Sequence, residues 1–203
     1  MQTVIGLDVG TTGTKAAVCD PQGRVLGKAY CEYDLHFTGD GGVEQNAADW
    51  IGAVRTAVRE AVAASGATPD SIAAISLSTQ GGSVWARGEH GEALTPVMTW
   101  MDGRAHAEAD DLRMLAGERL YRASGWQVGA GFDAAKLLWL RRNRPEVFEK
   151  AVGFDRTRRR AFDRRSARGR GKAVVHRAEC DDDDPPCPNE RHGSRCSADP
   201  ILF

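Results

Sequence analysis

Residues 4–20 read VIGLDVGTTGTKAAVCD, and they predict two antiparallel strands joined by a loop rich in Gly and Thr. A short apolar run ends at Asp8, and the residues from 14 to 20 alternate in the manner of a half-buried strand. PQG at 21–23 then turns the chain into a third strand pattern. The three segments indicate an antiparallel meander whose first connection is the loop at 10–13.

The composition of this first loop suits an anion. Gly10 and Gly13 permit positive φ and close approach, so the N–H groups of a tight hairpin can converge on a phosphate. Thr11 and Thr12 add hydroxyl donors. The loop lacks the spacing G-x-x-x-x-G-K-[ST] and is therefore not a P-loop. A plain hairpin turn is the alternative that the loop alone leaves open.

Two charged residues flank the loop. Lys15 adds a mobile positive charge on its C-terminal side. Asp8 stands at the end of the first strand, where its carboxylate can hold a hydrated Mg²⁺ rather than a phosphate. We therefore expect Asp8 to be the metal-binding residue of this loop.

The following residues alternate between strand and helix patterns. Apolar residues recur at helical spacing over 47–64, with Gly66 just beyond, and IAAISLS is typical of a buried strand that ends in the loop TQGG. A second hairpin is expected over 83–102, turning at GEHGE. Helical patterns then cover residues 104–117, 118–124 and 134–151, the last interrupted by Pro145. This order predicts an α/β domain with a mixed sheet.

Composition divides the chain near residue 154. All five Trp lie before residue 155, whereas half of the 22 Arg fall within residues 155–203. Only six residues of that C-terminal tail are Ile, Leu, Val, Phe, Met, Trp or Tyr, too few to offset the entropy of ordering it. We predict a folded unit over 1–154 and a disordered tail over 155–203.

The sequence shows no targeting or membrane signal. It has no apolar run of 18 residues, and its N-terminus enters a strand pattern without a charged segment and cleavage site. We expect a cytoplasmic protein that has no membrane partner. Cys19 and Cys31 lack a framework spacing, which favours reduced and mostly buried thiols.

Four motifs in order resemble the N-terminal half of the FGGY family of carbohydrate kinases, with most similarity to the xylulokinases. They are GLDVGTTGTKAAVCDPQGRVL, ISLSTQGG, PVMTWMDGRA and GFDAAKLLWLRRNRPEVF, all within residues 3–150. The resemblance implies the ribonuclease-H-like fold of actin, Hsp70 and sugar kinases, in which two such domains clamp ATP. It also implies that the first loop is the family's phosphate-binding hairpin, with ATP and Mg²⁺ as cofactors and a small sugar as substrate.

The same resemblance places a sugar site at two later motifs. In the family, the loop matching STQGG contacts the sugar through two residues, and Gly81 and Gly82 occupy their positions in this chain. Kinases of a three-carbon polyol carry long charged side chains there and xylulokinases carry other residues, whereas the two glycines of this chain remove side-chain bulk. Contacts would have to come from backbone or from neighbouring residues, and a plain tight turn is the other interpretation.

The motif at 96–105 offers three further candidates. Trp100 presents a flat apolar face for a sugar, and Asp102 can accept two hydroxyl hydrogen bonds. Arg104 could instead hold Asp102 in place. Equally, Trp100 could be core and Asp102 the N-cap of the next helix. Trp126 and Trp139 are predicted to be core residues.

Phosphoryl transfer also needs groups that, in the family, lie in later segments of the kinase. Its base is an Asp near the end of the first domain, and most ATP contacts come from the second domain, so no catalytic residue is assigned within 1–154. We expect little or no turnover from this chain. A non-enzymatic fragment that binds a sugar or partner, or a pseudogene product, is the alternative. An uncovered apolar face would then favour self-association.

The tail permits three interpretations. Its abrupt rise in Arg, Pro and Cys is what out-of-frame translation of a GC-rich gene gives, so we predict a frameshift or truncation near residue 155. Zinc ligation is a weaker hypothesis, because the spacing lacks a C-x2-C knuckle. The Arg clusters at 156–170 could contact nucleic acid, but the four-Asp run at 181–184 opposes this, and we expect no nucleic-acid partner. The possible zinc ligands are His176, Cys180, Cys187, His192 and Cys196.

Overall fold

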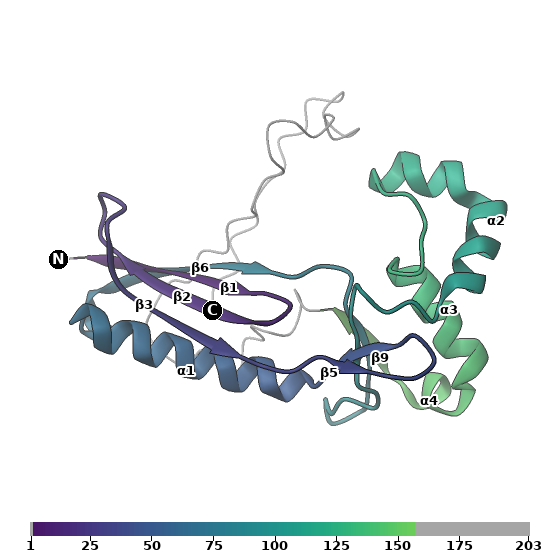
Figure 1. The fold of residues 1–203 in the computed structure, drawn as a ribbon, viewed down its shortest axis with the longest axis horizontal. Coiled ribbons are helices and arrows are strands. Elements are labelled where there is room, and N and C mark those ends of the chain that lie inside the picture. The colour runs from purple at the N-terminus through teal and green to yellow at the C-terminus, as the bar shows by residue number, and fades with distance from the viewer. Residues whose placement is uncertain (1, 157–203) are drawn as a thin grey trace.

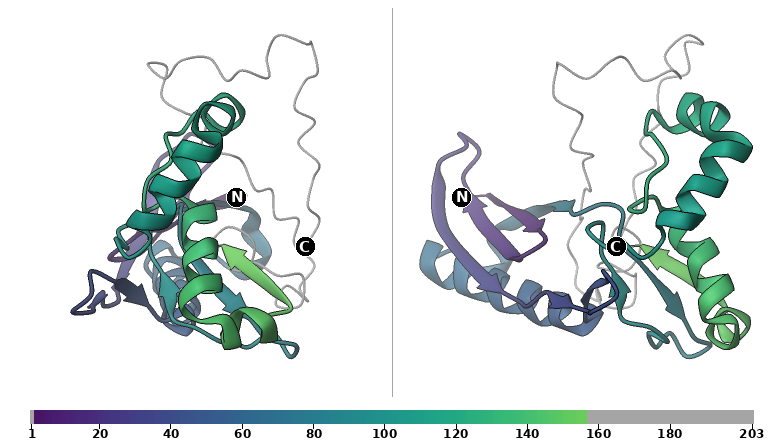
Figure 2. Two further views of the ribbon diagram at one scale, coloured as in Figure 1. Left: turned by 90° about the vertical axis from the view of Figure 1, so that its right-hand side faces the viewer. Right: turned by 45° about the vertical axis from the view of Figure 1, so that its right-hand side comes forward.

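The structure is a computed structural model that describes residues 2–156 (Figure 1). The described residues form two sheets and four α-helices. The first sheet and α1 lie at one end, and helices α2, α3 and α4 gather at the other (Figures 1 and 2). The tail predictions, namely disorder, a frameshift, zinc ligation and nucleic-acid contacts, fall on residues outside the described range, apart from Asp155 and Arg156.

The first sheet confirms the predicted meander. Its strand order is β3-β2-β1-β6, in which β1 pairs antiparallel with β2, β2 pairs antiparallel with β3, and β6 runs parallel to β1. Across the central pair Asp8 lies opposite Lys15, and on the other side Asp8 lies opposite Ser78. The sheet is therefore mixed, as predicted. Its strands are Thr3–Val9 (β1), Gly13–Cys19 (β2), Val25–Glu32 (β3) and Ile72–Thr79 (β6).

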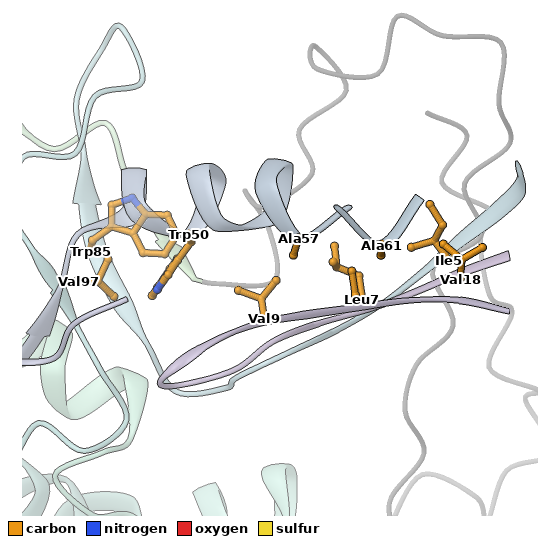
Figure 3. Packing of buried hydrophobic residues seen from close by; sticks show 10 residues of the cluster. Ile5, Leu7, Val9, Val18, Trp50, Ala57, Ala61, Trp85 and Val97 are labelled. Carbon is orange, nitrogen blue, oxygen red and sulfur yellow. The ribbon is translucent and has the colours of Figure 1, made fainter. Parts of the chain in front are cut away.

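Helix α1, Ala47–Ser65, covers one face of this sheet and confirms the predicted helix. The side chain of Asn46 caps its first turn by accepting a hydrogen bond from the Ala48 N–H, and Gly66 ends it in the left-handed conformation. Between helix and sheet lies the main core, extended by an edge-to-face contact of Trp50 and Trp85 with ring centroids 5.8 Å apart (Figure 3). The core residues are Ile5, Leu7, Val9, Ala16, Val18, Trp50, Ala57, Ala61, Trp85 and Val97.

One glycine of β3 lets the helix approach the sheet. A Cβ at Gly27 would lie 2.5 Å from the Ala61 carbonyl oxygen and 2.5 Å from the Ser65 nitrogen. Both are main-chain atoms of α1, so neither can rotate away. The α1 backbone can therefore lie this close to β3 only because residue 27 has no side chain.

The second sheet has the strand order β4-β5-β8-β7-β9. Strands β7 and β8 confirm the predicted hairpin, since Val84 pairs with Met98 and Arg87 bridges Ala93 across the turn. Strand β9 was not predicted; it pairs antiparallel with β7, and Arg87 Nε lies 3.1 Å from Asp155 Oδ2. The strands are His36–Phe37 (β4), Val43–Gln45 (β5), Val84–Arg87 (β7), Val97–Met98 (β8) and Gly153–Arg156 (β9).

The remaining helices follow the predicted patterns. Helix α2, His106–Ser124, has non-helical backbone angles at Ala116, close to where the two predicted segments meet. Helix α3, Asp133–Asn143, and helix α4, Pro145–Lys150, are separated at the predicted proline. A short 3-10 helix, Pro69–Ser71, precedes β6.

Three details correct the sequence predictions. Strand β6 alternates between half-buried and exposed residues rather than being fully buried, because α1 is the only helix of residues 2–156 that covers the sheet. Trp126 is 74% exposed and not core, since the turn after α2 points it to solvent. Asp155 and Arg156, assigned to the tail, belong to β9. Within residues 2–156 no helix combines the length and apolarity needed to cross a bilayer.

Candidate functional site

The β1–β2 hairpin is a tight turn that its neighbours hold in place. The Gly10 N–H donates to the Gly13 carbonyl at 3.0 Å, and the Tyr33 hydroxyl donates to the Gly10 carbonyl at 2.6 Å. Neither Gly10 nor Gly13 has positive φ, so the sequence-based reason given for these two glycines was wrong in that respect. At Gly13 the requirement is space instead, because a Cβ there would lie 2.5 Å from the ring of Tyr30.

The charged residues that flank the hairpin share one hollow. Asp8 and Lys15 lie opposite each other on the sheet face that α1 leaves open, and the hollow on that face has a volume of about 830 Å³. Tyr30 lines it too, and the Lys15 ammonium lies 5.8 Å from the centroid of its ring. Lys28, Ser76 and Ser78 complete its polar lining.

The tip of the hairpin reaches the motif at 96–105. The indole N–H of Trp100 donates to Thr11 Oγ1 at 2.9 Å, and Gln45 Nε2 donates to the Thr11 carbonyl at 2.7 Å. Thr12 is exposed, with its hydroxyl 3.5 Å from that of Tyr30. Trp100 is 50% exposed, so the core interpretation of this residue was wrong.

The loop at 80–82 lies beside the same hairpin. The Gln80 N–H donates to the Val9 carbonyl at 2.9 Å, and its side-chain amide donates to Gln45 Oε1 at 3.0 Å. Gly82 has a φ of +65°, and a Cβ on it would come 3.2 Å from Cβ of Trp100. Within the part of the chain that the structure describes, no heavy atom lies within 4 Å of a Cβ at Gly81. The fold therefore brings Gly82, Trp100 and Thr11 together.

Asp102 and Arg104 form an ion pair below this surface. Asp102 is 1% exposed, and its Oδ2 accepts from Arg104 Nη2 at 2.6 Å and from the Val43 N–H at 3.1 Å. Arg104 also contacts Glu44 at 2.7 Å, and its guanidinium lies 4.8 Å from the Trp139 ring centroid. Burial opposes the charge of Arg104, but hydrogen bonds and charge from Asp102 and Glu44 outweigh it and raise the pKa of that guanidinium.

This geometry bears on the alternatives for Asp102. Helix α2 has Ala105 at its N-cap, so Asp102 is not its capping residue. The carboxylate is held by Arg104, as the second interpretation proposed. A direct contact between Asp102 and a sugar hydroxyl stays a prediction.

The sequence analysis missed Lys136, the most buried charged residue of this region. It lies in α3, is 0% exposed, and its Nζ donates to the Gly82 carbonyl at 2.5 Å and to the Thr99 carbonyl at 2.6 Å. Burial lowers its pKa to about 8, against the nearby charges of Asp102 and Asp133. Its signal was a single Lys within the apolar segment AAKLLWL.

The side chains of the β1–β2 hairpin are of the types that bind a metal-bound phosphate. Mg²⁺ keeps several waters and needs only one or two carboxylates from a protein when phosphates supply other ligands. Asp8 offers one such carboxylate beside Lys15 in the hollow. Residues 2–156 contain no group of three or more His, Cys, Asp or Glu side chains that could hold a metal ion.

Comparison with known proteins identifies the fold and the family. The model of the N-terminal domain of the FGGY family of carbohydrate kinases matches residues 3–157. The chain belongs to the FGGY family of carbohydrate kinases. Its α/β architecture is thus the ribonuclease-H-like fold of the sugar kinases, as predicted.

Relatives of this FGGY chain bear more than one substrate name. A glycerol kinase of Aromatoleum aromaticum is 34% identical over 143 residues, which cover 69% of this chain and 29% of that protein. A xylulose kinase of Bacillus subtilis is 29% identical over 154 residues, which cover 76% of this chain and 31% of that protein.

The ligand-bound xylulose kinase structure from Lactobacillus acidophilus superposes with a TM-score of 0.70 at 30% identity, over 76% of this chain and 31% of that one. The chain therefore spans about 30% of the length of these relatives.

Proposed function

We propose that this FGGY chain forms the sugar-binding and phosphate-binding wall of an ATP-dependent kinase that phosphorylates a hydroxyl of a pentulose such as xylulose. The hydrogen bond from Trp100 to Thr11 carries the proposal, because it joins the predicted sugar side to the predicted phosphate side. In phosphoryl transfer the phosphoryl group moves from ATP to the sugar hydroxyl, so the phosphate side and the sugar side must adjoin.

On the phosphate side we assign the hairpin and its flanking charges. The threonine hydroxyls and the hairpin N–H groups other than that of Gly10, which donates to the Gly13 carbonyl, would contact phosphate oxygens, and Lys15 would offset their charge. Asp8 would hold Mg²⁺ through its waters, and the metal would neutralise charge on the phosphates. The assigned residues are Asp8, Gly10, Thr11, Thr12 and Lys15.

On the sugar side we assign the loop at 81–82 and the motif at 100–104. The open space at Gly81 supports a substrate larger than glycerol, since no side chain of residues 2–156 fills the position where kinases of a three-carbon polyol carry long ones. Trp100 would offer its exposed ring face to the sugar carbons. Arg104 would act through Asp102, which it holds in place.

Ligand binding tests this function without requiring turnover. Calorimetric titration of the chain with D-xylulose should give a saturable isotherm, and glycerol should bind more weakly. A folded chain that binds neither polyol would contradict the proposal. The expectation of little turnover is checked separately by coupled ADP release, because the base and most ATP contacts were predicted to lie outside residues 1–154.

Self-association remains a prediction. The open face of the first sheet carries the hollow, and Val4 and Tyr30 on that face are exposed. A second copy of the chain covering this face would bury apolar surface. Light scattering should then show a mass that rises with protein concentration, and a constant monomer mass would contradict it.

A further inference from the structure

Lys136 joins the two segments that were assigned to the sugar. Its ammonium contacts the Gly82 carbonyl of one loop and the Thr99 carbonyl directly before Trp100. The Thr99 carbonyl also accepts from the Asp102 N–H at 3.0 Å. One buried amine thus fixes the backbone on both sides of the surface that Trp100 presents.

The tight packing around Trp100 makes that backbone position matter. A Cβ at Gly82 would lie 3.2 Å from Cβ of Trp100, and one at Gly131 would lie 2.7 Å from the Trp100 carbonyl oxygen. A shift of either segment would therefore move the indole. The indole in turn donates to Thr11, so the same shift would reach the hairpin.

A buried lysine is a costly way to fill this space. Removing an ammonium from water is unfavourable, and burial lowers the pKa of Lys136 to about 8. An apolar side chain of similar volume would pack without that cost. The partners of Nζ are the two carbonyls, so holding them is the contribution that the amine makes here.

We infer that Lys136 is a positioning residue that sets Gly82 and Trp100 at the spacing the sugar requires and keeps the Trp100 indole on Thr11. This inference rests on the proposed function in taking a sugar as the ligand, whereas the contacts of Lys136 do not depend on that function. Lys136 acts through the two carbonyls and does not touch the sugar, because it is fully buried.

The test uses the full chain with Lys136→Met, which keeps the volume and removes the donors, and Lys136→Arg, which keeps the charge with a different reach. Leu140→Ala is the matched control, because Leu140 is buried in the same helix and is a purely apolar residue. The readouts are the ¹H–¹⁵N resonance of the Trp100 indole, assigned by its loss in Trp100→Phe, and the affinity for D-xylulose.

We expect the indole resonance to move in both Lys136 variants and the affinity to fall about tenfold, while Leu140→Ala keeps both near wild type despite its lower stability. If Lys136→Met does not fold, Lys136→Arg decides. An unchanged indole resonance in a folded variant, or equal loss of affinity in Leu140→Ala, would overturn the inference. If the wild type binds no polyol, the proposed function fails, and the indole resonance alone decides the role of Lys136.

Discussion

The indole N–H of Trp100 donates to the hydroxyl oxygen of Thr11, 89 residues earlier in the chain, over 2.9 Å. Thr11 lies at the tip of the β1–β2 hairpin, and Trp100 follows β8 of the second sheet. The contact therefore connects the two sheets at the point where the candidate phosphate and sugar sides meet.

Replacing Trp100 should separate the role of its ring from that of its N–H. Trp100→Phe keeps a flat apolar face, so D-xylulose affinity should fall only a few-fold, whereas Trp100→Ala should lower it at least tenfold. Trp126→Ala is the control, because Trp126 is 74% exposed and was not assigned to the site. Titration calorimetry measures all three, and equal losses for Trp100→Ala and Trp126→Ala would contradict the assignment.

Arg104 should matter more for stability than other ion-paired arginines. Arg104→Met leaves the carboxylate of Asp102 buried without its partner, which should cost about 3–5 kcal/mol of unfolding free energy. Arg122→Met is the control, since the Arg122 and Glu118 side chains are 77% and 78% exposed and a surface pair of this kind contributes little to the free energy of unfolding. Urea denaturation compares the two, and similar losses would argue against this electrostatic account.

Two glycine substitutions should change stability in opposite directions. Gly27→Ala places a Cβ against the α1 main chain and should cost about 1–3 kcal/mol. Gly52 lies within α1 where a Cβ meets no atom of the described residues within 4 Å, so Gly52→Ala should add about 1 kcal/mol through helix propensity. Thermal and urea unfolding measure both, and a stabilising Gly27→Ala would show that β3 and α1 are not this close.

Lys136 should make stability depend on pH in the alkaline range. Its pKa is about 8 in the folded chain against 10.5 ordinarily, so between these values the unfolded chain binds more protons. Stability from this group therefore rises with pH, by about 3 kcal/mol over the whole window. The charges acting on it are those of Asp102, Asp133 and Arg104.

The pH effect is isolated by subtraction. Unfolding free energies of wild type and Lys136→Met, measured in urea from pH 7 to 10, should diverge in favour of the wild type as pH rises above 8. Parallel curves for the two proteins would mean that Lys136 is protonated throughout this range.

Much of the fold could be predicted because its signals are local. An apolar run, an alternating segment and the turn at 21–23 indicated the β1–β2–β3 meander, and helical spacing with Gly66 just beyond it indicated α1. Strand β9 escaped prediction because its pairing with β7 joins residues far apart in sequence. A four-residue strand carries too little pattern of its own.

The candidate site was predictable in residue type but not in arrangement. The motifs indicated Thr11 and Trp100 separately, whereas their hydrogen bond depends on how the two sheets pack. Lys136 was missed because its partners are main-chain carbonyls, which leave no mark on the sequence at Gly82 or Thr99. Burial of Trp126 was wrongly expected because residue type alone does not show which way a turn points.

The most direct measurement is a map of ligand-induced shifts in ¹H–¹⁵N spectra of the full chain. D-xylulose should move the amides of Gly81 and Gly82 and the Trp100 indole, while MgATP should move the amides of residues 10–13. Overlap at Thr11 and Trp100 is expected, because one hydrogen bond joins them. Spectra in which D-xylulose leaves Gly81, Gly82 and Trp100 unmoved, or moves only residues of the open sheet face, would contradict the account.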